Sequence, residues 1–203
     1  MAEERVKIAV QNGEAFLEGL LEKGRRGRNV VLCHPHPLYG GDMHNEVVRV
    51  MRRTFAMLGW TTLRFNFRAG GAAQGKRDAL DLLEVATFLH SRSEGPIDLA
   101  GYSYGAWAAM EAVQAGFCPD SLVLIAPPLD FLPFEGLNPP EAPTLITLGE
   151  SDEFCSQAAL SSWLSTGSHP DLHVEILPSV GHFYRGAEWE LSEKIRNFLA
   201  RLA

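Results

Sequence analysis

Short, continuous runs of apolar residues recur along the chain and alternate with longer segments of helical spacing. The first run, Val30-Val31-Leu32-Cys33, is rich in β-branched residues and too short for a helix. A run of this kind is typical of a strand that is buried on both faces. The same pattern predicts strands at residues 30–33, 61–67, 97–100, 121–126, 144–148 and 173–177.

Helices are expected between these strands. In residues 45–58, Val47, Met51, Phe55 and Leu58 fall on one face, because they are spaced three or four residues apart as on an α-helix. Similar spacing predicts helices at residues 77–90, 104–115 and 156–165, and a last helix from about residue 187.

The order of these elements predicts the fold class. Buried strands that alternate with helices form a mostly parallel sheet with helices on both faces, which is an α/β architecture. The segments 6–10 and 15–21 alternate apolar and polar positions more regularly, and we expect them to form an antiparallel hairpin at the sheet edge. Residues 127–143 hold six prolines, which exclude a long regular element. We therefore expect a small flap there and a minimal lid or none.

The composition is that of an ordinary globular protein, with 46% hydrophobic and 21% charged residues among 203, and we expect one domain, residues 1–203. The formal net charge of −7 gives no reason to expect nucleic acid or a membrane as partner. No apolar run approaches the roughly 20 residues of a membrane span, and no signal peptide is expected. Cys33, Cys118 and Cys155 are scattered, which favours free thiols and a cytoplasmic location. The oligomeric state stays open, a homodimer included.

The pentapeptide Gly101-Tyr102-Ser103-Tyr104-Gly105 is the clearest chemical signal in the chain. It matches G-x-S-x-G and lies between an expected strand and an expected helix, the context in which this motif presents a nucleophilic serine on a strained turn. Ser103 is therefore the candidate nucleophile, and the amide of Tyr104 is the candidate first donor to the oxyanion. The alternative is a glycine-rich turn with an incidental serine.

A serine hydroxyl needs an adjacent base, and in folds of this kind the acid and then the histidine follow the serine in chain order. His182 lies after the last expected strand, at the sheet edge where sites of open α/β sheets are found, and is the candidate base. His169 and His173 flank the beginning of that strand and are expected to be surface residues.

The orienting acid is expected just after strand 144–148. Asp152 is the first choice, because a residue a little past the strand can turn back towards the histidine loop. Glu150 and Glu153 are expected to be solvated. Asp130, which follows strand 121–126, is the alternative acid.

The loop HPHPLYGGDMHN, after the first buried strand, is expected to give the second oxyanion donor. Pro35 and Pro37 have no N–H, so the donor is the amide of His36, Leu38 or Tyr39, with Leu38 and His36 preferred.

Several motifs together resemble a known family. HPHP-x-x-GG-x-M-x-N, then RFNFR, GYSYGA, GESD and GHF, are similar to those of small bacterial α/β-superfamily hydrolases, which are similar in turn to dienelactone-hydrolase-like esterases and prolyl-oligopeptidase-type hydrolase domains. The resemblance runs from about residue 30 to the end. It implies an α/β-hydrolase fold with little or no lid and a triad of Ser103, Asp152 and His182. The loop 69–77 is shorter and more basic than is usual in similar sequences, so substrate contacts on that side are not carried over.

Two other patterns in the sequence are incomplete matches to known sites. Gly70-x-x-x-x-Gly75-Lys76 matches most of a phosphate-binding loop, but Arg77 replaces the Ser or Thr that holds Mg²⁺. Our hypothesis is instead that this basic loop attracts an anionic group of the substrate. His34, His36 and His44 suggest zinc, but no clustered carboxylate or cysteine joins them. We therefore expect no cofactor and no metal.

These observations predict a serine hydrolase that cleaves an ester or thioester of a small-molecule acyl substrate through an acyl-enzyme on Ser103. The alternatives are a serine peptidase that acts on short peptides and a non-catalytic member of the fold that binds a ligand.

Overall fold

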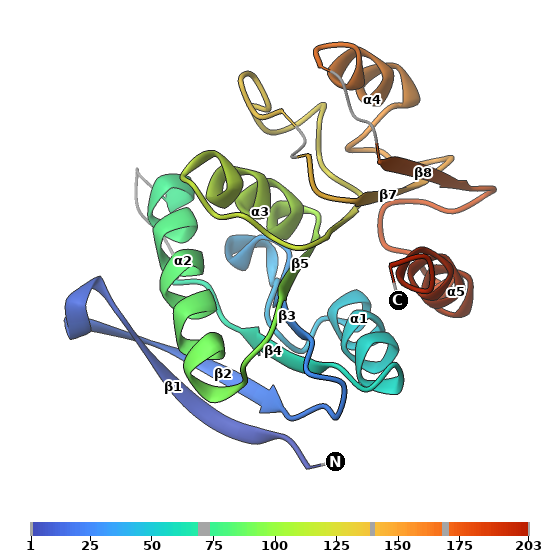
Figure 1. Ribbon diagram of the computed structural model, residues 1–203. Helices are drawn as coiled ribbons and strands as arrows, with labels where there is room; N and C mark the ends of the chain where they lie inside the picture. Colours follow the sequence, from blue (N-terminus) through green and yellow to red (C-terminus); the bar gives the residue numbers. More distant parts are fainter. Residues whose placement is uncertain (1, 69–73, 139–140, 168–170, 203) are drawn as a thin grey trace.

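The computed structural model describes residues 2–68, 74–138, 141–167 and 171–202, and it has the α/β architecture predicted from the sequence. Within these residues an eight-stranded sheet has the order β1-β2-β4-β3-β5-β6-β7-β8 (Figure 1). The strands are β1 Glu4–Val10, β2 Ala15–Glu22, β3 Asn29–Cys33, β4 Thr61–Phe65, β5 Ile97–Tyr102, β6 Leu122–Ile125, β7 Thr144–Gly149 and β8 Leu172–Leu177. The helices are α1 Glu46–Met57, α2 Gln74–Arg92, α3 Tyr104–Gln114, α4 Gln157–Leu164 and α5 Glu188–Leu199, with short 3₁₀ turns η1 Gln11–Gly13 and η2 Pro37–Tyr39.

The sheet is parallel from β4 to β8, and its first two strands are antiparallel. The hairpin of β1 and β2 lies at one edge, as the alternating pattern predicts, and β2 pairs with β4. The parallel strands β3, β4, β6 and β7 are buried throughout, as expected for strands covered on both faces, whereas β8 at the sheet edge is only partly buried.

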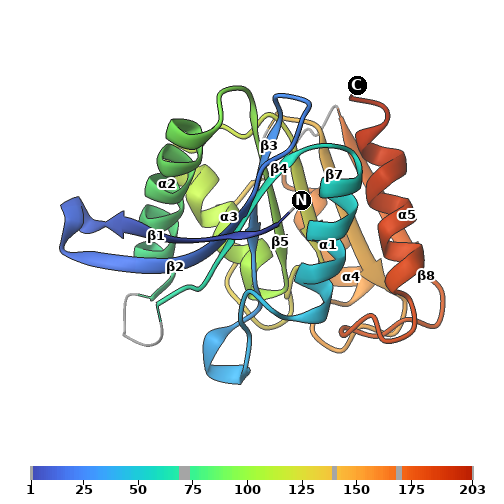
Figure 2. The ribbon, with the colours of Figure 1, turned by 90° about the horizontal axis from the view of Figure 1, so that it is seen from below.

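Two hydrophobic cores lie on the two faces of this sheet. Helices α2, α3 and α4 contribute buried residues to one core, and α1 and α5 contribute to the other. Figure 2 shows α2 and α3 on one side of the strands and α1 and α5 on the opposite side. Both faces are therefore covered, which leaves the sheet edges and the ends of the strands for function.

The expected element boundaries differ from the structure mainly at β4 and α2. Strand β4 ends at Phe65, two residues before the predicted end at residue 67, because the backbone hydrogen bonds to the neighbouring strand do not continue to Phe67. The amide of Asn66 still donates to the Glu18 carbonyl of β2, but the amide of Phe67 donates to the ring of His34. Helix α2 begins at Gln74, earlier than the predicted residue 77.

The proline-rich segment after β6 packs closely onto the domain. Phe134 and Leu137 are buried in the core. The indole N–H of Trp107 on α3 donates to the Pro133 carbonyl at 2.7 Å, and that of Trp163 on α4 donates to the Leu137 carbonyl at 2.6 Å. These contacts hold the flap down, in agreement with a site that has no lid. In the described part of the chain, no helix combines the length and apolar character that a membrane crossing requires.

Candidate active site

The loops after β3, β5, β7 and β8 all lie at the carboxyl ends of the sheet strands, because these strands are parallel. They carry the predicted oxyanion loop, Ser103, Asp152 and His182. The topology alone therefore brings segments far apart in the sequence to one place.

Ser103 lies between the end of β5 and the beginning of α3, with φ 54° and ψ −119°. A positive φ is strained for a residue with a side chain, and such strain persists only where the surroundings enforce it. They do so here: a methyl group at Gly101 would lie 2.2 Å from the carbonyl oxygen of Gly105, and one at Gly105 would lie 2.4 Å from that of Cys33. Both glycines of the motif are thus required by close backbone packing.

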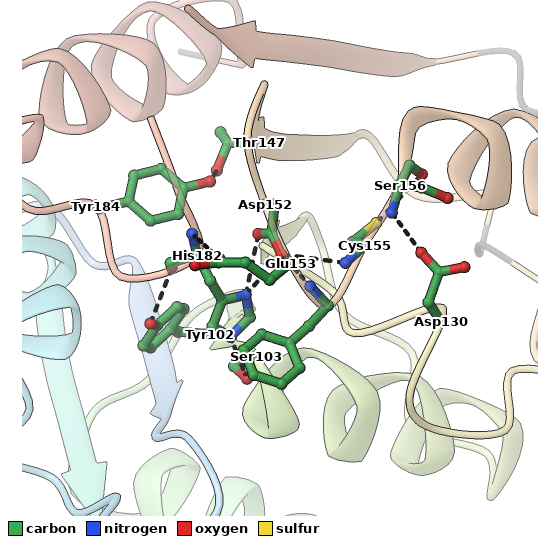
Figure 3. A network of polar contacts seen from close by, with 11 residues as sticks. Tyr102, Ser103, Asp130, Thr147, Asp152, Glu153, Cys155, Ser156, His182 and Tyr184 are labelled. Atoms are coloured by element: carbon green, nitrogen blue, oxygen red, sulfur yellow. Dashed lines mark hydrogen bonds and ion pairs between the residues drawn. The ribbon is translucent and has the colours of Figure 1, made fainter. Parts of the chain in front are cut away.

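Ser103, His182 and Asp152 form a continuous hydrogen-bonded chain (Figure 3). The Nε2 atom of His182 is 2.9 Å from Ser103 Oγ, and its Nδ1 atom is 3.0 Å from each carboxylate oxygen of Asp152. A carboxylate partner makes Nδ1 the donor, so in the neutral ring Nε2 is left to accept the serine proton. This is the arrangement that a base-activated serine requires.

The loop after β7 fixes the Asp152 carboxylate, whose side chain is fully buried. Its Oδ1 atom accepts hydrogen bonds from the amides of Phe154 at 2.9 Å and Cys155 at 3.1 Å. The carboxylate therefore has a fixed orientation towards His182.

The main chain of His182 is held from both sides. Its amide donates to the Glu153 carboxylate at 3.2 Å, and its carbonyl accepts the hydroxyl of Tyr102 at 3.0 Å (Figure 3). Glu153 is exposed, as expected, but its contact with the main chain of His182 is not predicted by the sequence. Hydrogen bonds from its own amide and from that of His182 lower the pKa of the Glu153 carboxyl.

The alternative acids have other partners. The Asp130 carboxylate accepts the amide of Ser156, the residue that caps α4 (Figure 3). The Glu150 carboxylate is exposed and accepts the amide of Ser179 at 2.9 Å. Asp152 is the carboxylate that the structure places against the His182 ring. His173 lies on β8 beside Asp171, and His169 is outside the described residues.

The predicted oxyanion loop forms the 3₁₀ turn η2, which decides how its amides are used. The amide of Leu38 donates to Nδ1 of His36 at 3.1 Å, and the amide of Tyr39 donates to the His36 carbonyl at 3.1 Å. Leu38 is 66% exposed and does not line the pocket beside Ser103, whereas His36 does. The structure thus brings His36, but not Leu38, to Ser103. The His36 ring packs edge-on against the ring of Tyr104, with centroids 4.5 Å apart.

Comparisons with known proteins find serine hydrolases of the same fold, although no family model matches the chain. It is 30% identical over 183 residues to the uncharacterized protein RP471 of Rickettsia prowazekii, covering 83% of this chain and 77% of that protein. It is 26% identical, with a TM-score of 0.88, to XC6422 of Xanthomonas campestris, an α/β serine hydrolase without a lid, covering 100% of this chain and 95% of that one. The chain belongs to the α/β-hydrolase superfamily. A serine hydrolase homologue from Coxiella burnetii is also similar, with 28% identity, a TM-score of 0.86, and coverage of 100% of this chain and 99% of that one.

In this α/β hydrolase, two of the family-like motifs are joined by hydrogen bonds. The amide of Met43 donates to Asn66 Oδ1 at 2.9 Å, and the Met43 carbonyl accepts Nη1 of Arg64, also at 2.9 Å. Arg64 is 4% exposed and pairs with the carboxylate of Glu3 at 2.7 Å. The RFNFR segment, residues 64–68, therefore clasps the far end of the HPHP loop, which gives a physical reason for the two motifs to occur together.

His34 holds the near end of the same loop. Its Nδ1 donates to the Pro35 carbonyl at 2.6 Å, and its Nε2 accepts the amide of Phe67 at 2.9 Å. Burial lowers the pKa of the His34 ring to about 4, so the ring is neutral near pH 7. Both nitrogens have protein partners, and His34 acts as a structural clamp.

The side chain of Tyr104 reaches away from Ser103 to the beginning of α2. Its hydroxyl donates to the buried carboxylate of Asp78 at 2.5 Å, and burial raises the pKa of Asp78 to about 6. The guanidinium of Arg77 lies 3.6 Å from Asp78 and donates to the Arg68 carbonyl at 3.0 Å. Residues 69–73, including Gly70 of the phosphate-loop-like pattern, lie outside the described residues.

A pocket of about 410 Å³ opens beside Ser103. This volume is within the range of small-molecule sites. Tyr39, Tyr102 and Tyr104 all line it, and so do residues of the proline-rich flap. The lining residues are Pro35, His36, Tyr39, Gly40, Gly41, Asn45, Tyr102, Ser103, Tyr104, Pro128, Phe131, Leu132, Phe154, His182 and Phe183.

Proposed function

We propose that this hydrolase is a serine esterase that cleaves carboxylic esters or thioesters of small molecules through an acyl-enzyme on Ser103. The observation that carries the proposal is the hydrogen-bonded chain from Ser103 Oγ through the His182 ring to the buried Asp152 carboxylate, of which Ser103 and His182 line a pocket of small-molecule size. A purely binding pocket has no need of these three groups in this order.

In the proposed mechanism, Nε2 of His182 takes the proton of Ser103 as Oγ attacks the substrate carbonyl carbon. The tetrahedral intermediate collapses when the protonated ring gives this proton to the leaving oxygen or sulfur, and the alcohol or thiol departs. Water, deprotonated by the same ring, then attacks the acyl-enzyme; the ring returns this proton to Ser103 Oγ as the acyl–oxygen bond breaks and the acid departs. Asp152 keeps the ring in its tautomer and stabilises the imidazolium.

Two amides are proposed to stabilise the oxyanion. The first is that of Tyr104, which opens α3, and the second is that of His36. The commitment of the Leu38 amide to the His36 ring supports His36 over Leu38.

Labelling with a fluorophosphonate tests the nucleophile. Wild-type protein should be modified at Ser103, and Ser103→Ala should not. The same pair should differ by at least 10³ in kcat on p-nitrophenyl acetate, because the nucleophile is the step's reacting atom. A folded wild-type protein that neither labels nor hydrolyses esters would refute the proposal and favour a ligand-binding role.

A matched pair of variants tests the second donor. His36 has φ −59°, a value that proline also adopts. His36→Ala and His36→Pro both remove the ring, but only the proline variant removes the amide N–H. If that amide is the donor, kcat for His36→Pro should be about 10²–10³ lower than for His36→Ala. Equal kcat values would exclude it.

A further inference from the structure

The described side chains around the pocket carry no fixed charge. Among its lining residues none is Asp, Glu, Lys or Arg. A charged substrate group would therefore lose water there without gaining an ionic partner, which is unfavourable. Neither Lys76 nor Arg77 lines the pocket, and the Arg77 guanidinium faces Asp78. The pocket is thus suited to uncharged molecules and argues against an anionic acyl group.

Three phenylalanines, here called the aromatic wall, gather beside the candidate base. The ring of Phe154 lies 4.6 Å from the His182 ring between centroids, and that of Phe183 lies 5.5 Å from it. Phe131 packs edge-on against Phe154 at 5.6 Å. Phe131 is 58% exposed and Phe183 is 55% exposed, although both line the pocket. Covering this open aromatic surface with an apolar group is favourable, because it removes apolar area from water.

The position of the base tells which part of an ester lies against this wall. In the tetrahedral intermediate the oxyanion points to the His36 and Tyr104 amides, whereas the leaving oxygen must lie within reach of Nε2 of His182, which protonates it. The group attached to the leaving oxygen therefore extends from His182, where the aromatic wall stands. The acyl group takes the remaining direction.

From this placement we infer that the preferred substrate is an uncharged ester with an aromatic or bulky apolar alcohol part, and that Phe131 and Phe183 determine this specificity. The inference rests on the proposed function, because it takes Ser103 as nucleophile and His182 as the proton donor to the leaving group.

Two isomeric esters test the orientation. Benzyl acetate and methyl phenylacetate contain the same atoms, and their leaving alcohols have similar acidity, but the ring lies on the alcohol side in the first and on the acyl side in the second. We expect kcat/KM for benzyl acetate to exceed that for methyl phenylacetate by about tenfold or more. Phe131→Ala and Phe183→Ala should each reduce this ratio several-fold.

Phe16→Ala is the matched control, because Phe16 is 62% exposed on β2 and does not line the pocket, and its ratio should equal that of wild type. A second pair, benzyl butyrate and monobenzyl succinate, tests charge, and the anionic ester should be the poorer substrate. A ratio that favours methyl phenylacetate, a ratio unaffected by Phe131→Ala and Phe183→Ala, or a preference for the succinate would overturn the inference. If Ser103 also fails to react with a fluorophosphonate, the proposed function itself fails; if Ser103 reacts, only the substrate assignment fails.

Discussion

Replacing Asp152 by Asn is the most informative single change, because it keeps the shape of the acid and alters only its hydrogen bonding. In the structure Oδ1 accepts the amides of Phe154 and Cys155, whereas no amide of the described residues donates to Oδ2, and both oxygens lie 3.0 Å from Nδ1 of His182. The introduced asparagine would keep its side-chain carbonyl oxygen on the two amides, which are donors only. Its NH₂ group would then face Nδ1 and donate to it.

The histidine ring would consequently change its tautomer. Nδ1 would become an acceptor, the proton would move to Nε2, and Nε2 could no longer take the proton of Ser103. A wrong tautomer in an otherwise intact triad costs about 10⁴ in kcat. This factor corresponds to roughly 5 kcal/mol of transition-state stabilisation. We expect a loss of this size for Asp152→Asn, with a small change in KM, since the side chain does not line the pocket.

The assay is steady-state hydrolysis of p-nitrophenyl acetate, together with the rate of fluorophosphonate labelling, on variants shown to be folded by circular dichroism. Asp130→Asn is the control, because its carboxylate contacts the amide of Ser156 and not the histidine. It should retain kcat within a few-fold of wild type. If Asp152→Asn kept kcat within tenfold of wild type, or Asp130→Asn lost as much activity, the assignment of the acid would be wrong.

The remaining predictions concern stability. The pKa of His34 is about 4 in the folded protein against an ordinary 6.5, so between these pH values only the unfolded chain binds the extra proton. The free energy of unfolding should therefore fall as the pH drops from 6.5 to 4, by at most about 3 kcal/mol from this group. Urea unfolding measures this, and His34→Asn should show a flatter pH profile than wild type. Gly105→Ala should lower the free energy of unfolding by about 1–3 kcal/mol, and therefore Tm, because the new methyl group would lie 2.4 Å from the Cys33 carbonyl. A raised Tm, which helix propensity alone would give, would contradict the packing argument. Tyr104→Phe removes a hydrogen-bond donor to the buried carboxylate of Asp78, whose pKa is about 6. The substitution should lower the free energy of unfolding by about 1–3 kcal/mol at pH 8 and by less at pH 5, where this carboxyl is protonated. Denaturant unfolding at the two pH values measures the cost, and an equal cost at both would count against the role of the carboxylate charge.

Regular elements could be predicted from the sequence because their signals are local. Helix α1, for example, begins after Asn45, whose side chain caps the amide of Val47, and it ends at Met57, next to Leu58, the last residue of its apolar spacing. The boundary of β4 was predicted less well, since the amide of Phe67 is drawn from the sheet by a ring more than thirty residues earlier in the chain, and no local pattern records such a partner.

The candidate site divides in the same way. Ser103, Asp152 and His182 were chosen from motif and chain order, and the structure places them in contact. The choice between Leu38 and His36 could not be made, because it depends on which amides the turn η2 uses for its own hydrogen bonds.

Contacts of Glu153 with His182, and the packing of Phe154 on the histidine ring, were also missed. A glutamate beside a strand end looks the same in sequence whether it is solvated or bonded to a distant amide. The GHF motif does contain Phe183, but no local sequence pattern predicts that Phe131 lines the same pocket.

The ion pair of Glu3 with Arg64 gives the beginning of the chain an influence on the loop beside Ser103. Arg64 is buried and holds both this carboxylate and the carbonyl of Met43. Without Glu3 its guanidinium would be left with an unbalanced charge in a low-dielectric site, and rotating it towards water would release Met43. An affinity tag fused next to Glu3, or a deletion that reaches it, is therefore expected to affect more than the outer edge of the sheet where it is made. It would also disturb the loop that positions His36.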